Sequence, residues 1–350
     1  MNYECKFEDK KMIKRDIENK KYIEKALQLI DEKGIKVAPE KKDELILQLR
    51  YEFFRNDVKD NIEDYLNDCL LERVKKFLSD DYIIIPKAIF ILSNICNLSC
   101  ESCSALMPKF SSPWEISIQD ALFYIENFLR GTDEVIQFNL VGGEPLLYKD
   151  LDQILYYLQN HEKVRKISMF TNGTVIPSAK VLEALRGNKV EVMLSDYGDL
   201  VKMANFVKTM EENQISFMVR TDFQWIDFGD SYDRKKSIET ITKEFRNCIF
   251  SRNCRAILKD KFFVCERAAR MYMLKAYSPQ NDFVILSTDD SDKQIRNKIL
   301  KMLKIEYAEG CNYCDAGKKE ARLITAGVQK NKIKSAYTLI SRDSLREAYR

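Results

Sequence analysis

Short β-rich runs alternate with amphipathic helical runs from residue 83 to residue 222 of this 350-residue chain. The β-rich runs are 83–95, 134–143, 164–172, 189–196 and 215–222, and the helical runs lie near 117–130, 149–160, 178–186 and 200–212. Such alternation is typical of a parallel sheet with helices packed outside it. Five or six units in a stretch of about 165 residues fit a partial βα barrel better than a complete eight-unit barrel.

The chain on either side of this region has a different pattern. Residues 20–80 are predicted to be helical, and one apolar stripe at steps of three and four contains Ile62, Tyr65, Leu66, Cys69, Leu70, Val74, Phe77 and Leu78. Cys69 is therefore expected in the core. After residue 247 the alternation stops, and 256–265 reads as a hairpin that turns at Lys259–Asp260. We predict an α/β protein with a helical extension (1–82), a partial barrel core (83–247) and a C-terminal α+β extension (248–350).

Composition excludes several classes of function. No apolar run approaches 18 residues and no signal peptide is visible, so a cytoplasmic protein without a membrane span is expected. The 57 basic and 54 acidic residues nearly balance, which does not indicate a nucleic-acid partner. The basic stretch 329–350 reads as a solvated tail. His161 is the only histidine, which excludes Ser-His-Asp triads and histidine-rich metal sites.

Polar and small residues follow each predicted strand. Because parallel strands end at one edge of a sheet, these residues should converge there. They are Cys96, Gly142–Glu144, Thr171–Asn172, Ser195–Asp196 and Arg220.

Eight of the ten cysteines fall into two groups, Cys96, Cys100 and Cys103, and then Cys248, Cys254, Cys265, Cys311 and Cys314. In a reducing cytosol such clusters suggest metal sites rather than disulfides. Three thiolates spaced C-x3-C-x2-C could hold three irons of an iron–sulfur cluster and leave the fourth iron open. A structural zinc ion would instead need a fourth ligand, which a distal cysteine could supply.

The motifs "CNLSCESC" (96–103) and "VGGEP" (141–145) together resemble the radical S-adenosylmethionine (radical SAM) superfamily. The resemblance implies that Cys96, Cys100 and Cys103 hold a 4Fe–4S cluster whose open iron binds S-adenosylmethionine. One electron, from a flavodoxin- or ferredoxin-like donor, would cleave this cofactor to methionine and a 5′-deoxyadenosyl radical, which takes a hydrogen atom from the substrate. Ser102 departs from the family, which often has an aromatic residue there.

The same resemblance implies the residues that contact S-adenosylmethionine. Leu98 matches a common apolar position of the cysteine loop. The segment Gly142, Gly143 and Glu144 would meet the methionine ammonium group. Polar contacts to the ribose and carboxylate are expected from Asn172, Ser195 and Arg220.

The distal cysteines resemble the twitch extension of the SPASM/twitch branch, which carries an auxiliary 4Fe–4S cluster. That pattern favours Cys248, Cys265, Cys311 and Cys314 as ligands, with Asp260 in place of the usual glycine. Four thiolates would suit zinc equally well. Cys254 is then spare, either a structural thiol or a hydrogen-atom donor to a substrate radical.

This branch acts on sugars and cyclitols or on ribosomally made peptides. The helical N-terminal segment weighs against a leader-peptide-binding domain, so we expect dehydrogenation or epimerisation of a carbohydrate-type small molecule. Candidate pocket residues are Tyr148, Trp225, Asp227 and Arg267. The alternatives are a peptide-modifying maturase and a non-catalytic iron–sulfur or zinc protein.

Overall fold

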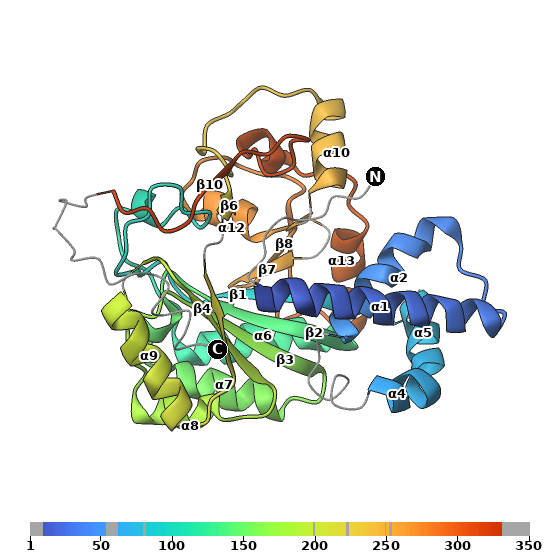
Figure 1. Ribbon diagram of the computed structural model, residues 1–350. Coiled ribbons are helices and arrows are strands. Elements are labelled where there is room, and N and C mark those ends of the chain that lie inside the picture. The colour runs from blue at the N-terminus through green and yellow to red at the C-terminus, as the bar shows by residue number, and fades with distance from the viewer. Residues whose placement is uncertain are drawn as a thin grey trace.

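The computed structural model describes residues 10–53, 62–79, 82–198, 200–221, 224–248, 250–251 and 254–330. Among these, the main sheet has the order β5-β4-β3-β2-β1-β7-β8-β9 (Figure 1). Its strands are β1 (Ile84–Ile91), β2 (Glu134–Val141), β3 (Val164–Thr171), β4 (Val190–Ser195), β5 (Phe217–Arg220), β7 (Cys254–Leu258), β8 (Lys261–Phe263) and β9 (Phe283–Ile285). A second sheet pairs β6 (Gln224–Ile226) with β10 (Leu323–Thr325). Of the basic stretch 329–350, residues 331–350 lie outside the described part.

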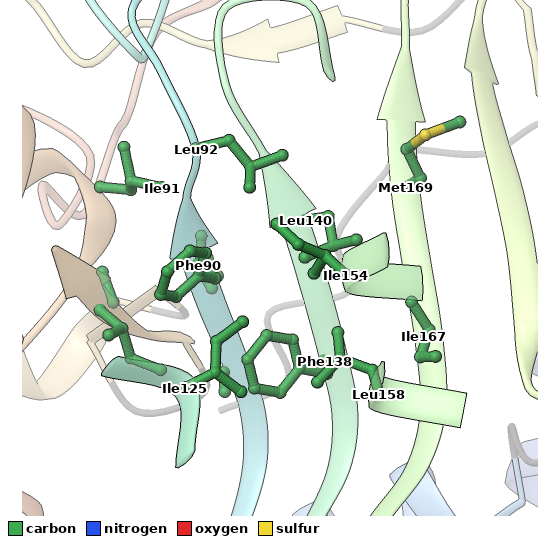
Figure 2. Close-up of a cluster of buried hydrophobic side chains, with 14 of the residues drawn as sticks. Phe90, Ile91, Leu92, Ile125, Phe138, Leu140, Ile154, Leu158, Ile167 and Met169 are labelled. Atoms are coloured by element: carbon green, nitrogen blue, oxygen red, sulfur yellow. The ribbon is translucent and has the colours of Figure 1, made fainter. Parts of the chain in front are cut away.

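The predicted α/β architecture is confirmed. Strands β1 to β5 are mutually parallel. An α-helix follows each of the first four strands before the next strand begins. These helices are α6 (Ile118–Arg130), α7 (Leu151–Asn160), α8 (Ala179–Leu185) and α9 (Leu200–Glu212). Figure 2 shows how Ile125 of α6 and Leu158 of α7 pack on Phe138 of β2. Their burial stabilises the fold by roughly 2 kcal/mol per side chain.

The main sheet continues past the predicted boundary at residue 247. Strand β7 runs parallel to β1 on the side away from β2, with Cys254 opposite Lys87. The hairpin β7–β8 turns at Lys259, whose φ of 52° is left-handed, as expected for a turn at Lys259–Asp260. Beyond the sheet lie α10 (Ile238–Asn247), α12 (Glu266–Met273), α13 (Asp292–Leu303) and a 3-10 segment (Glu309–Tyr313). The barrel core and the C-terminal extension therefore share one sheet.

The described part of the N-terminal extension is helical, as predicted, with α1 (Lys10–Glu32), α2 (Pro39–Glu52), α4 (Ile62–Asp64) and α5 (Leu70–Leu78). It packs against the start of β2 through Arg73, which donates to Glu134 at 2.7 Å. Although α1 has 23 residues, none of the helices in the described part of the chain combines the length and the apolar character that crossing a bilayer requires.

The prediction that Cys69 packs in the core was wrong. A π-helical turn at Tyr65–Cys69 makes the Leu70 amide bond back to Tyr65 instead of to residue 66. This adds one residue to the turn, so that Leu70 rather than Cys69 lies below Tyr65 on the buried face. Cys69 is exposed and Leu70 is fully buried.

Candidate active site

One cavity of about 330 Å³ lies at the carboxyl ends of the parallel strands and is lined by both cysteine groups. The predicted contacts to S-adenosylmethionine also line it, namely Leu98, Gly142, Gly143, Glu144, Asn172, Ser195 and Arg220. The cysteines that line it are Cys96, Cys100, Cys103, Cys248, Cys254, Cys265, Cys311 and Cys314. Residues from separate parts of the chain, from Cys96 to Cys314, thus meet at one place, and those at the ends of parallel strands do so because these ends converge.

The first cysteine loop follows β1 and exposes its thiols to the cavity. Leu98 donates its backbone N–H to the Cys96 sulfur at 3.5 Å, and this bond helps to orient the loop. Burial raises the pKa of the Cys96 thiol to about 11, and the neighbouring groups Glu144, Cys103 and Cys100 add to the effect. The three thiols therefore lie close enough to influence one another.

Gly143 lets the loop after β2 pack directly on the first cysteine. A Cβ atom at this position would lie 2.5 Å from Cys96 Cβ and would also overlap the Ile95 carbonyl oxygen. The next residue, Glu144, donates its N–H to that same carbonyl at 2.8 Å. Only glycine allows this close approach.

Glu144 joins the ends of β2 and β3. Its carboxylate accepts hydrogen bonds from Thr171 Oγ1 (2.7 Å), the Asn172 amide (2.8 Å) and the Leu146 amide (3.1 Å). Burial raises the pKa of this carboxyl, while the three donors oppose the rise. Glu144 therefore fixes the end of β3 against the loop after β2 through these hydrogen bonds.

Asn172 connects the end of β3 to the cysteine loop. It donates from Nδ2 to Asn97 Oδ1 at 3.1 Å, and Asn97 donates to Thr174 Oγ1 at 2.6 Å. The sequence did not indicate this role of Asn97, because the hydrogen bond joins two loops that are 75 residues apart.

Two aromatic side chains, Tyr197 after β4 and Trp225 of β6, line the cavity with residues from the ends of β4 and β5. Ser195 is the register partner of Arg220, and both line the cavity beside Tyr197 and Trp225. The rings of Tyr197 and Trp225 meet edge to face with centroids 5.5 Å apart. Trp225 and Arg267 line the cavity as suggested by the sequence, whereas Tyr148 is a core residue that donates to the Ile116 carbonyl. Asp227 accepts from the Gly229 amide in a turn.

Four of the five distal thiols lie close enough for one to affect the pKa of another. Burial is the main cause that raises the pKa of Cys265, and Cys248 and Cys314 contribute after it. The pKa of Cys311 is likewise raised by burial and then by Cys265, Cys314 and Cys248. For Cys254, burial also raises the pKa, and its charged neighbours are Lys87, Glu266 and Arg255; Cys254 in turn contributes to the raised pKa of Cys248. The assignment of Cys248, Cys265, Cys311 and Cys314 as the ligand set, with Cys254 outside it, therefore stays a prediction.

The loop that carries Cys311 and Cys314 is held by a buried lysine. Lys236 donates from Nζ to the Cys311 carbonyl (2.9 Å), the Cys314 carbonyl (2.7 Å) and Glu244 (2.6 Å). Sequence reasoning missed Lys236, because its partners lie about 75 residues further along the chain.

Helix α12 ties the two cysteine groups together. Cys265 is its N-cap residue and accepts from the Ala268 amide. Two turns of the helix then supply buried arginines: Arg270 donates to the carbonyls of Ser93 and Gly142, and Arg267 donates to the carbonyl of Ser104 at 2.9 Å.

The donor chemistry fits iron–sulfur clusters. All nine described cysteines are free thiols, and thiolates are the usual ligands of such clusters. Four thiolates would suit a single zinc ion as well. Within the described ranges, no three His, Cys, Asp or Glu side chains are grouped so as to hold one metal ion.

Comparison with known proteins finds a family to which the middle of the chain is similar. Residues 90–211 match the family model described as "Radical SAM superfamily". GTP 3′,8-cyclase of Staphylococcus saprophyticus is 31% identical over 148 residues, which are 37% of this chain and 41% of that protein. GTP 3′,8-cyclase of Clostridium acetobutylicum is 29% identical over 127 residues, 35% of this chain and 38% of that protein. The chain therefore spans less than half the length of these relatives.

Three solved structures are similar to this one at low sequence identity. "Native anSMEcpe with bound AdoMet" has a TM-score of 0.43 and 14% identity, and the alignment covers 69% of this chain and 93% of that chain. BtrN in complex with AdoMet and 2-DOIA has a TM-score of 0.41 and 13% identity, with 69% and 100% covered. Streptococcus suis SuiB bound to S-adenosylmethionine has a TM-score of 0.33 and 14% identity, with 59% and 53% covered. The match to the radical SAM family model runs from the end of β1 to α9.

Proposed function

We propose that this protein is a radical enzyme that cleaves S-adenosylmethionine and takes a hydrogen atom from a sugar or cyclitol derivative, which it dehydrogenates or epimerises. One observation carries the proposal. The three-cysteine loop, the GGEP segment and the strand-end residues line the same cavity as a second set of four cysteines.

Cys96, Cys100 and Cys103 would hold a 4Fe–4S cluster with one open iron. When bound, the cluster and S-adenosylmethionine would supply methionine and a 5′-deoxyadenosyl radical, using one electron from a flavodoxin- or ferredoxin-like donor. The chain orients these groups: Gly143 brings the GGEP loop against Cys96, and Glu144 fixes Asn172. Leu98, Gly142, Ser195 and Arg220 would complete the contacts to S-adenosylmethionine.

Cys248, Cys265, Cys311 and Cys314 would hold an auxiliary 4Fe–4S cluster at the same cavity. Dehydrogenation requires the substrate radical to lose one further electron and one proton. Epimerisation requires it to gain a hydrogen atom, which the Cys254 thiol could give. The resulting thiyl radical would then be restored by one electron from the flavodoxin- or ferredoxin-like donor and one proton from solvent.

A small hydroxylated substrate is supported by one buried polar atom in the cavity lining. Asn139 is buried, lines the cavity, and its Oδ1 has no hydrogen-bond partner among the residues that the structure describes. Such an acceptor suits a substrate hydroxyl, since a buried oxygen without a partner costs about 1–3 kcal/mol. Ile89, which lies opposite Asn139 in the sheet, also lines the cavity, as does Lys87.

The peptide-modifying alternative receives less support. In the described residues before β1, helices are the regular secondary structure, whereas a leader-peptide-binding winged-helix domain begins with strands. The non-catalytic alternative leaves the GGEP loop and the residues that order it without a ligand.

The test uses anaerobically reconstituted protein with dithionite and S-adenosylmethionine. An extract of cells grown in heavy water is separated into carbohydrate, peptide and nucleotide fractions, and each is added in turn. We expect deuterium to appear in 5′-deoxyadenosine only with the carbohydrate fraction. Transfer from the peptide fraction would favour the maturase alternative. Transfer from the nucleotide fraction would favour an activity like that of the GTP 3′,8-cyclases. A Cys100→Ala variant controls for transfer that does not need the first cluster.

A further inference from the structure

The last described residues of the chain form a strap, Leu323–Lys330, that closes over the first cysteine loop. The strap starts as β10, where Ile324 pairs with Trp225 of β6 (Figure 1). It then turns at Gly327, whose φ of 70° is left-handed and whose hypothetical Cβ would overlap the Tyr197 ring. The expectation of a solvated tail from residue 329 is therefore wrong for Gln329, which is half-buried at the site.

Backbone hydrogen bonds join the end of the strap to the cysteine loop. Glu101 donates to the Val328 carbonyl at 2.8 Å, and Lys330 donates to the Ser99 carbonyl at 2.9 Å. Cys100 and Gln329 face each other in an antiparallel bridge between these bonds. The strap thus reaches the middle cysteine of the motif from outside the barrel.

The Gln329 side chain is fixed by three hydrogen bonds. Its Oε1 accepts from the Ser99 amide at 2.8 Å, and its Nε2 donates to the Gly327 carbonyl at 2.7 Å and to the Cys100 sulfur at 3.1 Å. Reversing the amide would place its NH2 group against the Ser99 N–H and its oxygen against the Gly327 carbonyl. The orientation that points an N–H at the Cys100 sulfur is therefore the one the surroundings require.

We propose that Gln329 is a positioning residue that sets the reduction potential of the cluster held by Cys96, Cys100 and Cys103; this rests on the proposed function. An N–H directed at a thiolate sulfur stabilises its negative charge, and reduction adds one electron to the cluster and its thiolates. The hydrogen bond therefore favours the reduced form and raises the potential. Cys100 is only 7% exposed, so water cannot readily replace the amide donor.

The test is an EPR-monitored redox titration of the reconstituted full-length protein. S-adenosylmethionine is added to identify the signal of the cluster with the open iron, because the auxiliary cluster has four protein ligands. In Gln329→Leu, which has a similar volume and no donor, we expect this signal to appear at a more negative potential than in the parent. The auxiliary signal should keep its potential.

A Val328→Ala variant is the matched control, because Val328 is 44% exposed and contacts the loop through its backbone carbonyl. Its potential should equal that of the parent. An unchanged potential in Gln329→Leu would overturn the inference. If Gln329→Leu binds too little iron to be titrated, the same titration is made on Gln329→Met. A potential more negative than that of the parent is again expected, and an unchanged potential overturns the inference. If the parent itself assembles no cluster that responds to S-adenosylmethionine, the proposed function fails instead.

Discussion

Arg270 donates from Nη2 to the carbonyl oxygen of Gly142 at 2.8 Å, across 128 positions of sequence. Its Nη1 donates to the Ser93 carbonyl at 2.9 Å, and the whole side chain is buried. One arginine of the C-terminal extension thereby holds the loop after β1 and the loop after β2. The helix that carries it starts at Cys265, so the two cysteine groups share a rigid support.

Replacing Arg270 by methionine should destabilise the protein strongly. The change leaves two buried carbonyls without their donor and the Glu266 carboxylate without its ion pair. We expect the free energy of unfolding to fall by about 3–5 kcal/mol, measured by urea denaturation under anaerobic conditions. Arg246→Met is the control, because the Arg246–Glu306 pair is exposed and contributes less than about 1 kcal/mol. Equal losses in both variants would contradict the supporting role of Arg270.

A Gly143→Ala change should impair iron binding at the first cysteine loop. The added methyl group would push Cys96 and the Ile95 carbonyl away from the GGEP loop. We expect roughly half of the about eight irons of two 4Fe–4S clusters to be lost. Gly34→Ala is the control: Gly34 has a left-handed φ of 68° with open space around it, so alanine costs about 1 kcal/mol there without touching the site. Full iron content in Gly143→Ala would refute the close-packing argument.

The contact between the N-terminal helices and the sheet should make stability depend on pH. Burial raises the pKa of Glu134, but hydrogen bonds and charge from Arg73 and Arg165 outweigh it and lower the pKa. A carboxylate whose pKa is lower in the folded state adds stability above its unfolded pKa of about 4.3. That stability is lost as the pH falls through the folded pKa.

Glu134→Gln measures this contribution. At pH 7 we expect the free energy of unfolding of the iron-free variant to be about 3 kcal/mol below that of the iron-free parent. The difference should shrink as the pH falls from about 5 to about 3, because the parent's carboxylate becomes protonated as the pH passes its lowered pKa. A difference that stays constant over this range would show that the Glu134 charge does not contribute.

Iron content separates the distal ligands from Cys254. We expect Cys265→Ala to lose about half of the iron, because Cys265 lies among Cys248, Cys311 and Cys314. Cys254→Ala should keep the full amount. Loss of iron in Cys254→Ala with full iron in Cys248→Ala would exchange the two assignments. If Cys254→Ala also keeps full turnover, Cys254 is not a hydrogen-atom donor.

The barrel core could be predicted from sequence because its signals are local. Each predicted strand and helix between 83 and 222 overlaps its observed counterpart, since buried parallel strands read as apolar runs bounded by helical periods. The site motifs were also local. Family spacing was enough to select Leu98, Gly143, Glu144 and Asn172, all of which line the cavity.

The supports of the site could not be predicted in this way. Arg270, Lys236 and Gln329 act on partners 75 or more residues away, and each acts mainly on backbone carbonyls or a sulfur. Such contacts leave no local pattern in one sequence. The prediction that Cys69 is buried was wrong for a different reason. A single π turn shifts the helical period by one residue, and the sequence pattern does not reveal it.

Release of 5′-deoxyadenosine tests the central claim most directly. The reconstituted protein is incubated anaerobically with S-adenosylmethionine and dithionite, and products are quantified by liquid chromatography with mass spectrometry. We predict 5′-deoxyadenosine and methionine in equal amounts, with none above background in Cys100→Ala. Absence of 5′-deoxyadenosine from the parent, with its iron fully bound, would contradict the account.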